Sequence, residues 1–216
     1  MGVRVVVVED DAFTRTMLVS TLSQAGLSVI LETGSAAEAV QKAPNLKPAV
    51  AVLDLHLGIG PTGIDVAHAL RRNDPAIGII FLTSYSDPRL LDANLPPMPG
   101  NSQYLTKESV IQLEVLLQAI SNSLVNKSAK TKFKTTSNMN TLTDIQIEVL
   151  RLLANGMSNS EIAKRRVVSE KSVEVTIARI AKTLNLAKDS SRNQRVHMAK
   201  AYFSALGMNH KLHDEN

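Results

Sequence analysis

Five short runs of apolar, mostly β-branched residues recur along the first 125 residues and constrain the fold more than any other feature. The runs are Val3–Val8, Val29–Leu31, Ala49–Leu53, Ile77–Leu82 and Gln103–Leu105. Stretches with helical spacing lie near residues 12–25, 35–42, 64–72, 87–93 and 108–122. Near-continuous apolar runs indicate strands buried on both faces, and their alternation with helices indicates a parallel sheet covered by helices. We therefore predict a flavodoxin-like, doubly wound α/β domain with a five-stranded parallel sheet at residues 1–125.

The rest of the chain has a helical pattern. Thr143 and Ser158 each precede a Gln or Glu by three residues, which is the capping-box pattern at the start of a helix. A third helix is predicted from near Ser169, and a fourth follows it. We predict an all-α, four-helix domain with helix-turn-helix order at residues 142–208. The polar and basic stretch 126–141 is predicted to be a flexible linker.

Charge is distributed unevenly along the 216 residues, whose net charge is +4. Residues 1–125 carry 8 Lys and Arg against 12 Asp and Glu, a balance of −4, and residues 126–216 carry 16 against 8, a balance of +8. A basic half indicates a polyanionic partner such as nucleic acid, although a basic surface can also be simply solvated.

Composition also limits the cellular setting. The chain has no Cys, which excludes disulfides and thiolate metal sites and fits a reducing cytosol. No apolar run approaches the roughly 20 residues that span a bilayer, and the first residues lack the order of a signal peptide. We expect a cytoplasmic protein with no membrane partner.

The first apolar run ends in three acids, Glu9, Asp10 and Asp11. Like charges repel, so this sequence indicates either a cation site or a solvated turn, and Asp11 also suits the N-cap of the next helix. The third run ends in another acid, Asp54. Strands one and three are neighbours in a flavodoxin-like sheet, so we expect Glu9, Asp10 and Asp54 to converge at its carboxyl edge. Bound Mg²⁺ (or Mn²⁺) would relieve their repulsion.

Two further polar groups follow the last two strands, Thr83 after the fourth and Lys107 after the fifth. This set suits phosphoryl transfer to a carboxylate. Asp54 would attack in line, Mg²⁺ and Lys107 would offset charge on the phosphoryl oxygens, and Thr83 would bind an oxygen of the product. Taken singly, Asp54 could be an ordinary strand-end acid and Thr83 a helix cap. The five His residues have no metal-ligand spacing, and no His metal site is predicted.

Residues 1–125 resemble the receiver domain of a two-component response regulator. The residues that carry this resemblance are Glu9, Asp10, Asp54 as phosphoacceptor, Thr83 and Lys107. The resemblance further implies that the backbone carbonyl of His56 completes the metal shell. It also implies that Tyr104 is a switch aromatic that moves when Thr83 moves toward the phosphate, although Tyr104 could instead simply pack at the sheet edge.

Two features depart from the receiver pattern. Glu108 follows Lys107 where the family usually has Pro, and the segment after Asp54 is about one residue longer than is common. These departures bear on reaction rate and on the choice of partner. They remove no chemical group.

The third helix of the second domain is the predicted recognition helix. Its apolar positions should face the core, which turns a mixed, on balance basic surface outward for the major groove and its phosphates. The predicted DNA-binding residues are Lys171, Ser172, Glu174, Val175, Arg179 and Lys182. Residues 142–206 resemble the LuxR-type DNA-binding domain. Glu174 departs from the basic residue that is frequent there, and it could accept a hydrogen bond from a cytosine amino group.

A receiver followed by a LuxR-type domain resembles the NarL/FixJ class of response regulators. The resemblance implies a transcription regulator whose Asp54 is phosphorylated by a sensor histidine kinase and which binds double-stranded promoter DNA as a homodimer. A stripe of Val196, Ala199, Tyr202 and Phe203 on the last helix is expected in the core or in the dimer seam.

Two alternatives stay open at this point. In the first, the receiver is a protein-interaction module, and the chain regulates transcription without being phosphorylated. In the second, the chain is an aspartyl-phosphate hydrolase, which would need a second acid two residues after Asp54, where His56 stands. We expect no enzyme activity beyond the receiver's own phosphoryl transfer and slow autodephosphorylation.

Overall fold

The computed structural model describes residues 2–92, 95–110, 112–125, 132–134, 138–186 and 193–208. The chain divides into two compact units. The first is Met1–Thr83 with Leu95–Thr135, and the second is Ser84–Asn94 with Thr136–Asn216. The residues directly after the fourth strand, from Ser84, therefore belong to the second unit, whereas the chain from Leu95 to the fifth strand belongs to the first. This differs from the contiguous division at residue 125 expected from sequence.

A parallel sheet forms the centre of the first unit. Its strands are β1 (Arg4–Val8), β2 (Ser28–Thr33), β3 (Val50–Leu53), β4 (Gly78–Thr83), β5 (Ser102–Thr106) and β6 (Lys132–Lys134). They are arranged in the order β2-β1-β3-β4-β5-β6, and every neighbouring pair is parallel. The first five strands confirm the predicted flavodoxin-like order.

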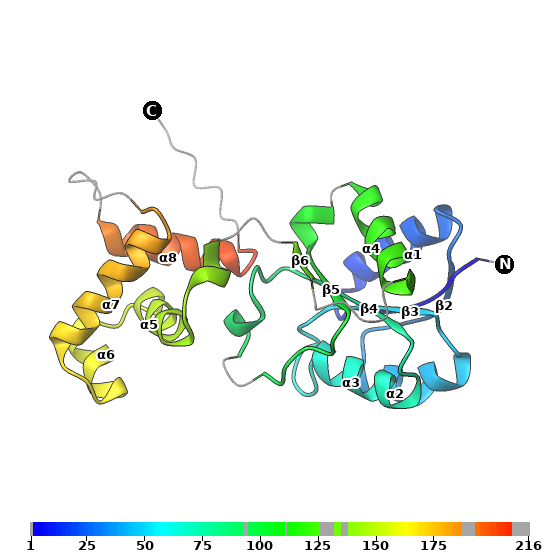
Figure 1. Cartoon of the computed structure of the whole chain (residues 1–216), viewed down its shortest axis with the longest axis horizontal. Coiled ribbons are helices and arrows are strands. Elements are labelled where there is room, and N and C mark those ends of the chain that lie inside the picture. The colour runs from blue at the N-terminus through cyan, green and yellow to red at the C-terminus, as the bar shows by residue number, and fades with distance from the viewer. Residues whose placement is uncertain are drawn as a thin grey trace. The chain divides into compact units, whose positions relative to one another are not determined.

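Helices cover both faces of this sheet. Helices α1 (Ala12–Gln24) and α4 (Leu113–Val125) lie on one face, and α2 (Ala36–Leu46) and α3 (Gly63–Asn73) lie on the other (Figure 1). Side chains alternate between the two faces of a strand. The core between the sheet and helices α1 and α4 includes Val5, Val7, Val50, Val52, Ile80, Leu82, Leu22, Leu116 and Ile120.

Two predicted segments differ in the structure. Within the stretch 87–93, the described residues 87–92 form a 3₁₀ turn at Pro88–Leu90 instead of the predicted α-helix, and residue 93 lies outside the described part of the chain. The stretch 126–141 is not a linker throughout, because β6 pairs with β5 and a 3₁₀ helix at Asn138–Thr141 places Met139 in the core of the second unit, with 3% of its surface exposed. The other linker residues lie outside the described part of the chain.

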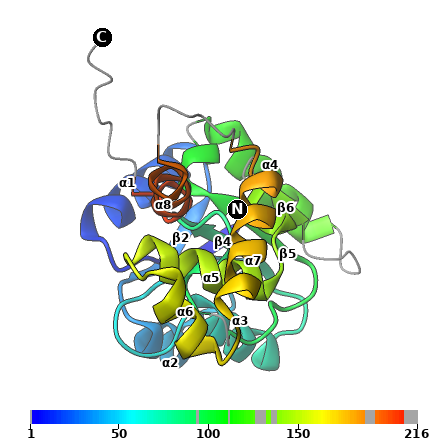
Figure 2. The same cartoon turned by 90° about the vertical axis from the view of Figure 1, so that its left-hand side faces the viewer.

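The second unit contains four helices, α5 (Asp144–Ala154), α6 (Asn159–Arg166), α7 (Glu170–Thr183) and α8 (Gln194–Ala205). Each begins at a capping residue, since Thr143, Ser158, Ser169 and Asn193 accept backbone hydrogen bonds from their first turns. The predicted capping boxes at Thr143 and Ser158 are confirmed. Figure 2 looks onto this unit and shows α8 almost end-on, with α7 lying across the view. The described helices include none long and apolar enough to cross a membrane.

The core of the second unit is built mainly from α5, with one apolar side from each of the other helices. The predicted stripe on α8 was expected in the core or in the dimer seam, and the core takes only part of it. Met198, Tyr202 and Ala205 are buried, whereas Val196 and Phe203 stay 52% and 37% exposed. The residues of the predicted stripe lie on two different sides of α8. Of them, only Tyr202 belongs to the core.

Candidate functional sites

The first site lies at the carboxyl edge of the sheet, where β1 and β3 end side by side. Glu9 follows β1 and Asp54 follows β3, and the Asp54 N–H donates to Val8 O at 2.8 Å. Oxygens of Glu9, Asp10 and Asp54 all lie within 4.8 Å of one another. The predicted convergence of the three acids is therefore what the structure shows.

Lys107, which follows β5, reaches the same edge. Its Nζ donates to Asp54 Oδ2 at 2.8 Å and to Glu9 Oε1 at 2.9 Å. The described part of the chain has no cis peptide bond, so Lys107 reaches both acids through a trans peptide to Glu108. One ammonium group thus bridges two carboxylates that are themselves nearly fully buried.

Burial governs the electrostatics of this cluster. It raises the pKa of Glu9 to about 7 against the opposing hydrogen bond from Lys107, and the charge of Asp54 adds to the rise. Burial on its own lowers the pKa of Lys107, but the charge of Asp54 and the hydrogen bonds to Asp54 and Glu9 outweigh it, so the pKa lies above its ordinary value. Lys107 is therefore a fixed positive charge, whereas Glu9 exchanges its proton near neutral pH.

The donor set fits a divalent cation. Glu9 Oε1 accepts hydrogen bonds from Lys107 and from the Asp11 N–H. The other carboxylate oxygen, Oε2, is buried and accepts no hydrogen bond, although Lys107 Nζ lies 2.8 Å from it. A buried carboxylate oxygen without a donor, beside two further carboxylates, suits a hard cation that prefers oxygen ligands. Such a cation could be held by Glu9, Asp10 and Asp54.

The loop after Asp54 is fixed by a close backbone approach. A Cβ on Gly63 would lie 2.0 Å from the Asp54 carbonyl oxygen, and the Gly63 N–H donates to Leu55 O at 3.0 Å. Thr62 caps α3 in a capping box with Asp65. The start of α3 is therefore packed directly on the backbone that presents Asp54.

The remaining predicted residues lie around this cluster. The His56 N–H donates to Asp54 Oδ1 at 3.3 Å, and its carbonyl remains a predicted ligand. Thr83 is buried at the end of β4, in register with Thr106, the residue before Lys107. Tyr104 is buried in β5, and its switch role remains a prediction.

Two residues near the acids, Asp11 and Arg15, have structural roles outside the candidate cation site. Asp11 caps α1, accepting from the Thr14 N–H at 2.8 Å as the sequence predicts. Arg15, one turn into α1, donates to the backbone carbonyl of Glu9 at 2.6 Å. Sequence reasoning missed Arg15, because nothing in the pattern of α1 distinguishes it from a solvated basic residue.

The second site is the outward surface of α7. Val173 and Ile180 are buried, and the six predicted DNA-binding residues are exposed. Lys171 and Glu174 form an ion pair at 3.5 Å in which both side chains face solvent, 82% and 52% exposed. Val175 is an apolar spot beside them, 41% exposed. The face presents a cation, an acid and a methyl-bearing side chain within one turn.

Some basic residues of this unit have structural partners instead. Arg166 pairs with Glu148 at 3.0 Å and donates to Ile145 O. Arg195 donates to Asn159 Oδ1 at 2.7 Å and to the carbonyl of Met157, which ties α8 to the start of α6. The positive charge of the second half is therefore divided between internal contacts and exposed surface.

Comparison with known proteins agrees with this geometry. The model of the response regulator receiver domain matches residues 5–121, and the model of bacterial regulatory proteins of the luxR family matches residues 140–199. The DNA-binding transcriptional activator DevR/DosR of Mycobacterium tuberculosis is 32% identical over 86% of this chain and 90% of its own length.

The chain is a NarL-type response regulator. The nitrate/nitrite response regulator protein NarP of Escherichia coli is also similar to this regulator, 32% identical over 85% of this chain and 89% of its own. A solved structure of RcsB dimers bound to DNA has the same fold, with a TM-score of 0.59 and 20% identity over 96% of this chain and 99% of the RcsB chain.

Proposed function

We propose that this response regulator is switched by phosphorylation of Asp54, with Mg²⁺ or Mn²⁺ held by Glu9, Asp10 and Asp54. The observation that carries the proposal is the Lys107 ammonium, 2.8 Å from Asp54 Oδ2. A carboxylate that accepts a phosphoryl group needs positive charge beside it, because the incoming group brings negative oxygens into a site that already holds acids.

In the proposed step, a carboxylate oxygen of Asp54 attacks the phosphorus of the donor. An O–P bond forms, and the bond between phosphorus and the donor breaks with its electron pair remaining on the donor. The donor is the phosphohistidine of a sensor histidine kinase or a small acyl phosphate. A bound cation supplies charge that offsets the phosphoryl oxygens and the acids around them.

The other residues of the site bind the product. Lys107 keeps its ammonium and turns from the Asp54 carboxylate to a phosphoryl oxygen, and the Thr83 hydroxyl donates to another. The His56 carbonyl completes the ligands of the cation, and Tyr104 follows Thr83. The receiver catalyses only its own phosphoryl transfer and slow dephosphorylation.

The output of the proposed function is binding of double-stranded DNA by α7. A recognition helix in the major groove would present Lys171, Glu174 and Arg179 to base edges and phosphates. The exposed Val196 and Phe203 of α8 supply an apolar surface for a second copy of the chain. DevR/DosR is named a DNA-binding transcriptional activator, and RcsB was solved as dimers on DNA, which supports this reading.

Acetyl phosphate with Mg²⁺ tests the proposal, because it donates without a kinase. Intact-mass measurement should show one phosphoryl adduct on the wild type and on Asp74→Asn, an acid outside the site, and none on Asp54→Asn. A wild type without an adduct, or an adduct that persists in Asp54→Asn, would instead favour a phosphorylation-independent regulator. Rapid, continuous phosphate release without accumulation of the adduct would favour the hydrolase.

A further inference from the structure

The first part of the connection from β4 to β5 is built into the DNA-binding unit. The chain passes from the first unit to the second between Thr83 and Ser84. Leu90 is 3% exposed and lies in the same core as Leu150 of α5 and Ile180 of α7. The Ser86 N–H donates to the carbonyl of Ala205, at the end of α8, at 2.8 Å. This segment, Ser84–Asp92, is therefore bound to the helices at two places.

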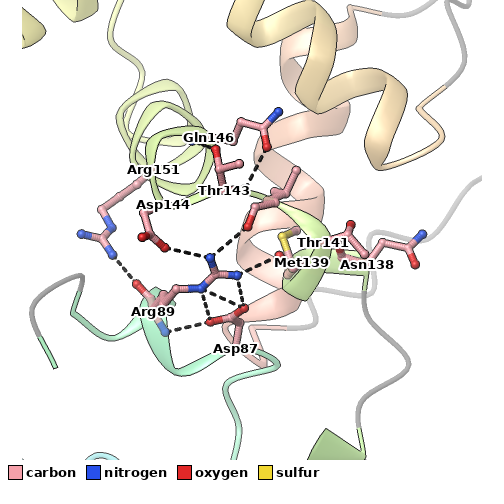
Figure 3. Close-up of polar contacts among 10 residues, drawn as sticks. Asp87, Arg89, Asn138, Met139, Thr141, Thr143, Asp144, Gln146 and Arg151 are labelled. Carbon is pink, nitrogen blue, oxygen red and sulfur yellow. Dashed lines mark hydrogen bonds and ion pairs between the residues drawn. The ribbon is translucent and has the colours of Figure 1, made fainter. Parts of the chain in front are cut away.

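Arg89 is the polar centre of the attachment (Figure 3). Its guanidinium donates to Asp144 Oδ1 at 2.8 Å, to Leu142 O at 2.9 Å and to Met139 O at 3.4 Å. Its own carbonyl accepts from Arg151 of α5 at 2.7 Å. Both the side chain and the backbone of one residue are thus bonded to the chain just before α5 and to α5 itself.

Asp87 fixes the direction of the guanidinium. It is 4% exposed, and it accepts from Arg89 Nη2 at 2.7 Å and from Arg89 Nε at 3.0 Å. A mostly buried, hydrogen-bonded ion pair has one favoured geometry, because burying either charge without its partner is strongly unfavourable. The pair therefore fixes the orientation of the guanidinium toward the chain before α5.

The end of α8 fits closely against the first residue of the segment. Gly207 has φ +76, and a Cβ there would lie 2.7 Å from the Ser84 Cβ. Only a glycine allows both this backbone conformation and this approach. A side chain at position 207 would therefore push Ser84 away from the end of α8.

We propose that Ser84–Asp92 is a latch through which phosphorylation of Asp54 reaches the DNA-binding helices, with Arg89 as its positioning residue. The inference rests on the proposed function. When Thr83 moves toward a phosphoryl oxygen, the peptide bond to Ser84 transmits the displacement into the Ser86–Ala205 and Arg89–Asp144 contacts. The closed latch stabilises the unphosphorylated arrangement, and phosphorylation shifts the population to the open one.

Hydrogen exchange tests the latch directly in the full-length wild type. Acetyl phosphate with Mg²⁺ should speed exchange of the amides in residues 84–92, including the Ser86 N–H, by about tenfold, because their bonds to α5 and α8 are broken more of the time. Unchanged exchange in a sample whose mass shows complete phosphorylation would overturn the proposal.

A matched pair of variants tests the coupling to DNA. In Asp87→Asn/Arg89→Gln the latch loses its charges without leaving one buried alone, and Arg72→Gln is the control, an exposed arginine on α3. DNA affinity is measured with and without acetyl phosphate, on a duplex selected from a random library with the phosphorylated wild type. Phosphorylation should raise the affinity of the wild type and of the control about tenfold. The unphosphorylated double variant should already lie within about twofold of the phosphorylated wild type.

The outcomes separate the two proposals. A wild type that takes up no phosphoryl group, or whose DNA affinity does not respond to it, removes the proposed function and the latch with it. A wild type that responds, with a double variant that responds equally, removes the latch alone. If the double variant does not fold, Asp144→Asn decides, because Asp144 is 81% exposed and its loss buries no charge. It should reduce the phosphorylation effect relative to Arg72→Gln, and an unreduced effect counts against the latch.

Discussion

Lys107 Nζ lies 2.8 Å from Asp54 Oδ2 and 2.8 Å from Glu9 Oε2, so a single ammonium is the counter-charge of two buried acids. Lys107→Met keeps most of the side-chain volume and removes this charge. We expect it to lower the free energy of unfolding by about 1–3 kcal/mol at pH 8, because two carboxylates are left without a counter-charge.

The decrease in the free energy of unfolding caused by Lys107→Met should be smaller at pH 5. At that pH a proton shared by the two acids replaces the ammonium. Urea unfolding followed by circular dichroism measures both values. Lys42→Met is the matched control, since its pair with Glu38 at 2.6 Å is solvent-exposed. The control should lose no more than about 1 kcal/mol. Equal losses in the two variants would show that burial adds nothing to the Lys107 pair.

The raised pKa of Glu9 predicts pH-dependent binding of Mg²⁺. With a pKa of about 7, Glu9 must lose a proton before it can bind a cation, so the dissociation constant should rise by about tenfold for each pH unit below 7. Isothermal titration calorimetry suits the measurement, since the chain has no Trp to report binding. Glu9→Gln should bind more weakly and lose this dependence, and a wild type with flat affinity from pH 5 to 8 would contradict the prediction.

The same pKa affects stability in the absence of metal. The folded-state pKa of Glu9 lies above its ordinary value of 4.5, so its contribution is fully present below that pH and is lost as pH rises through about 7. The free energy of unfolding of the wild type should therefore fall over this range more than that of Glu9→Gln. Mg²⁺ should restore it at pH 8.

The exposed face of α7 predicts opposite effects for its charges. Arg179→Ala should weaken DNA binding by about 1–3 kcal/mol if the side chain reaches a base edge, and Lys171→Ala should do the same. Glu174→Gln should strengthen binding to non-specific duplex, because it removes repulsion of phosphate and frees Lys171 from its 3.5 Å ion pair. Fluorescence anisotropy over a range of salt concentrations measures all three. Lys42→Ala is the control and should leave DNA affinity unchanged. If both alanine variants on α7 behave like this control, another surface of the protein contacts the DNA.

Val167, in the turn between α6 and α7, has an unfavourable backbone. Its φ is +54 and its side chain is 91% exposed, so a β-branched residue occupies the left-handed region without any packing in return. Val167→Asn should raise the free energy of unfolding by about 1 kcal/mol, because Asn adopts this conformation more readily. Val168→Asn, next to it but without a positive φ, should give no gain in thermal unfolding. Equal effects would mean that φ is not the cause.

The acid cluster could be predicted because each acid directly follows its strand in the sequence. A buried strand that ends in an acid places that acid at the carboxyl edge, and parallel order then brings Glu9 and Asp54 together. The caps of α5 and α6 were predictable for the same reason, since the cap and its partner, such as Ser158 and Glu161, lie within one turn.

The segment after β4 could not be predicted in this way. Its apolar spacing suggested a helix at 87–93, and Pro96, Pro97 and Pro99 follow too late in the chain to exclude one. Leu90 turns into a core formed by helices much later in the chain. The partners of Arg89 are equally remote in sequence, and no local pattern in the segment identifies them.

The attachment of Ser86 to Ala205 has a consequence for synthesis. During translation Ser86 and Leu90 leave the ribosome early, whereas their partners on α8 are synthesised only near the end. Until then the nascent chain has to carry this apolar stretch without its final neighbours. A premature stop codon before α8 would therefore damage the region behind β4 as well as delete a helix, and a receiver expressed alone would leave Leu90 open to aggregation.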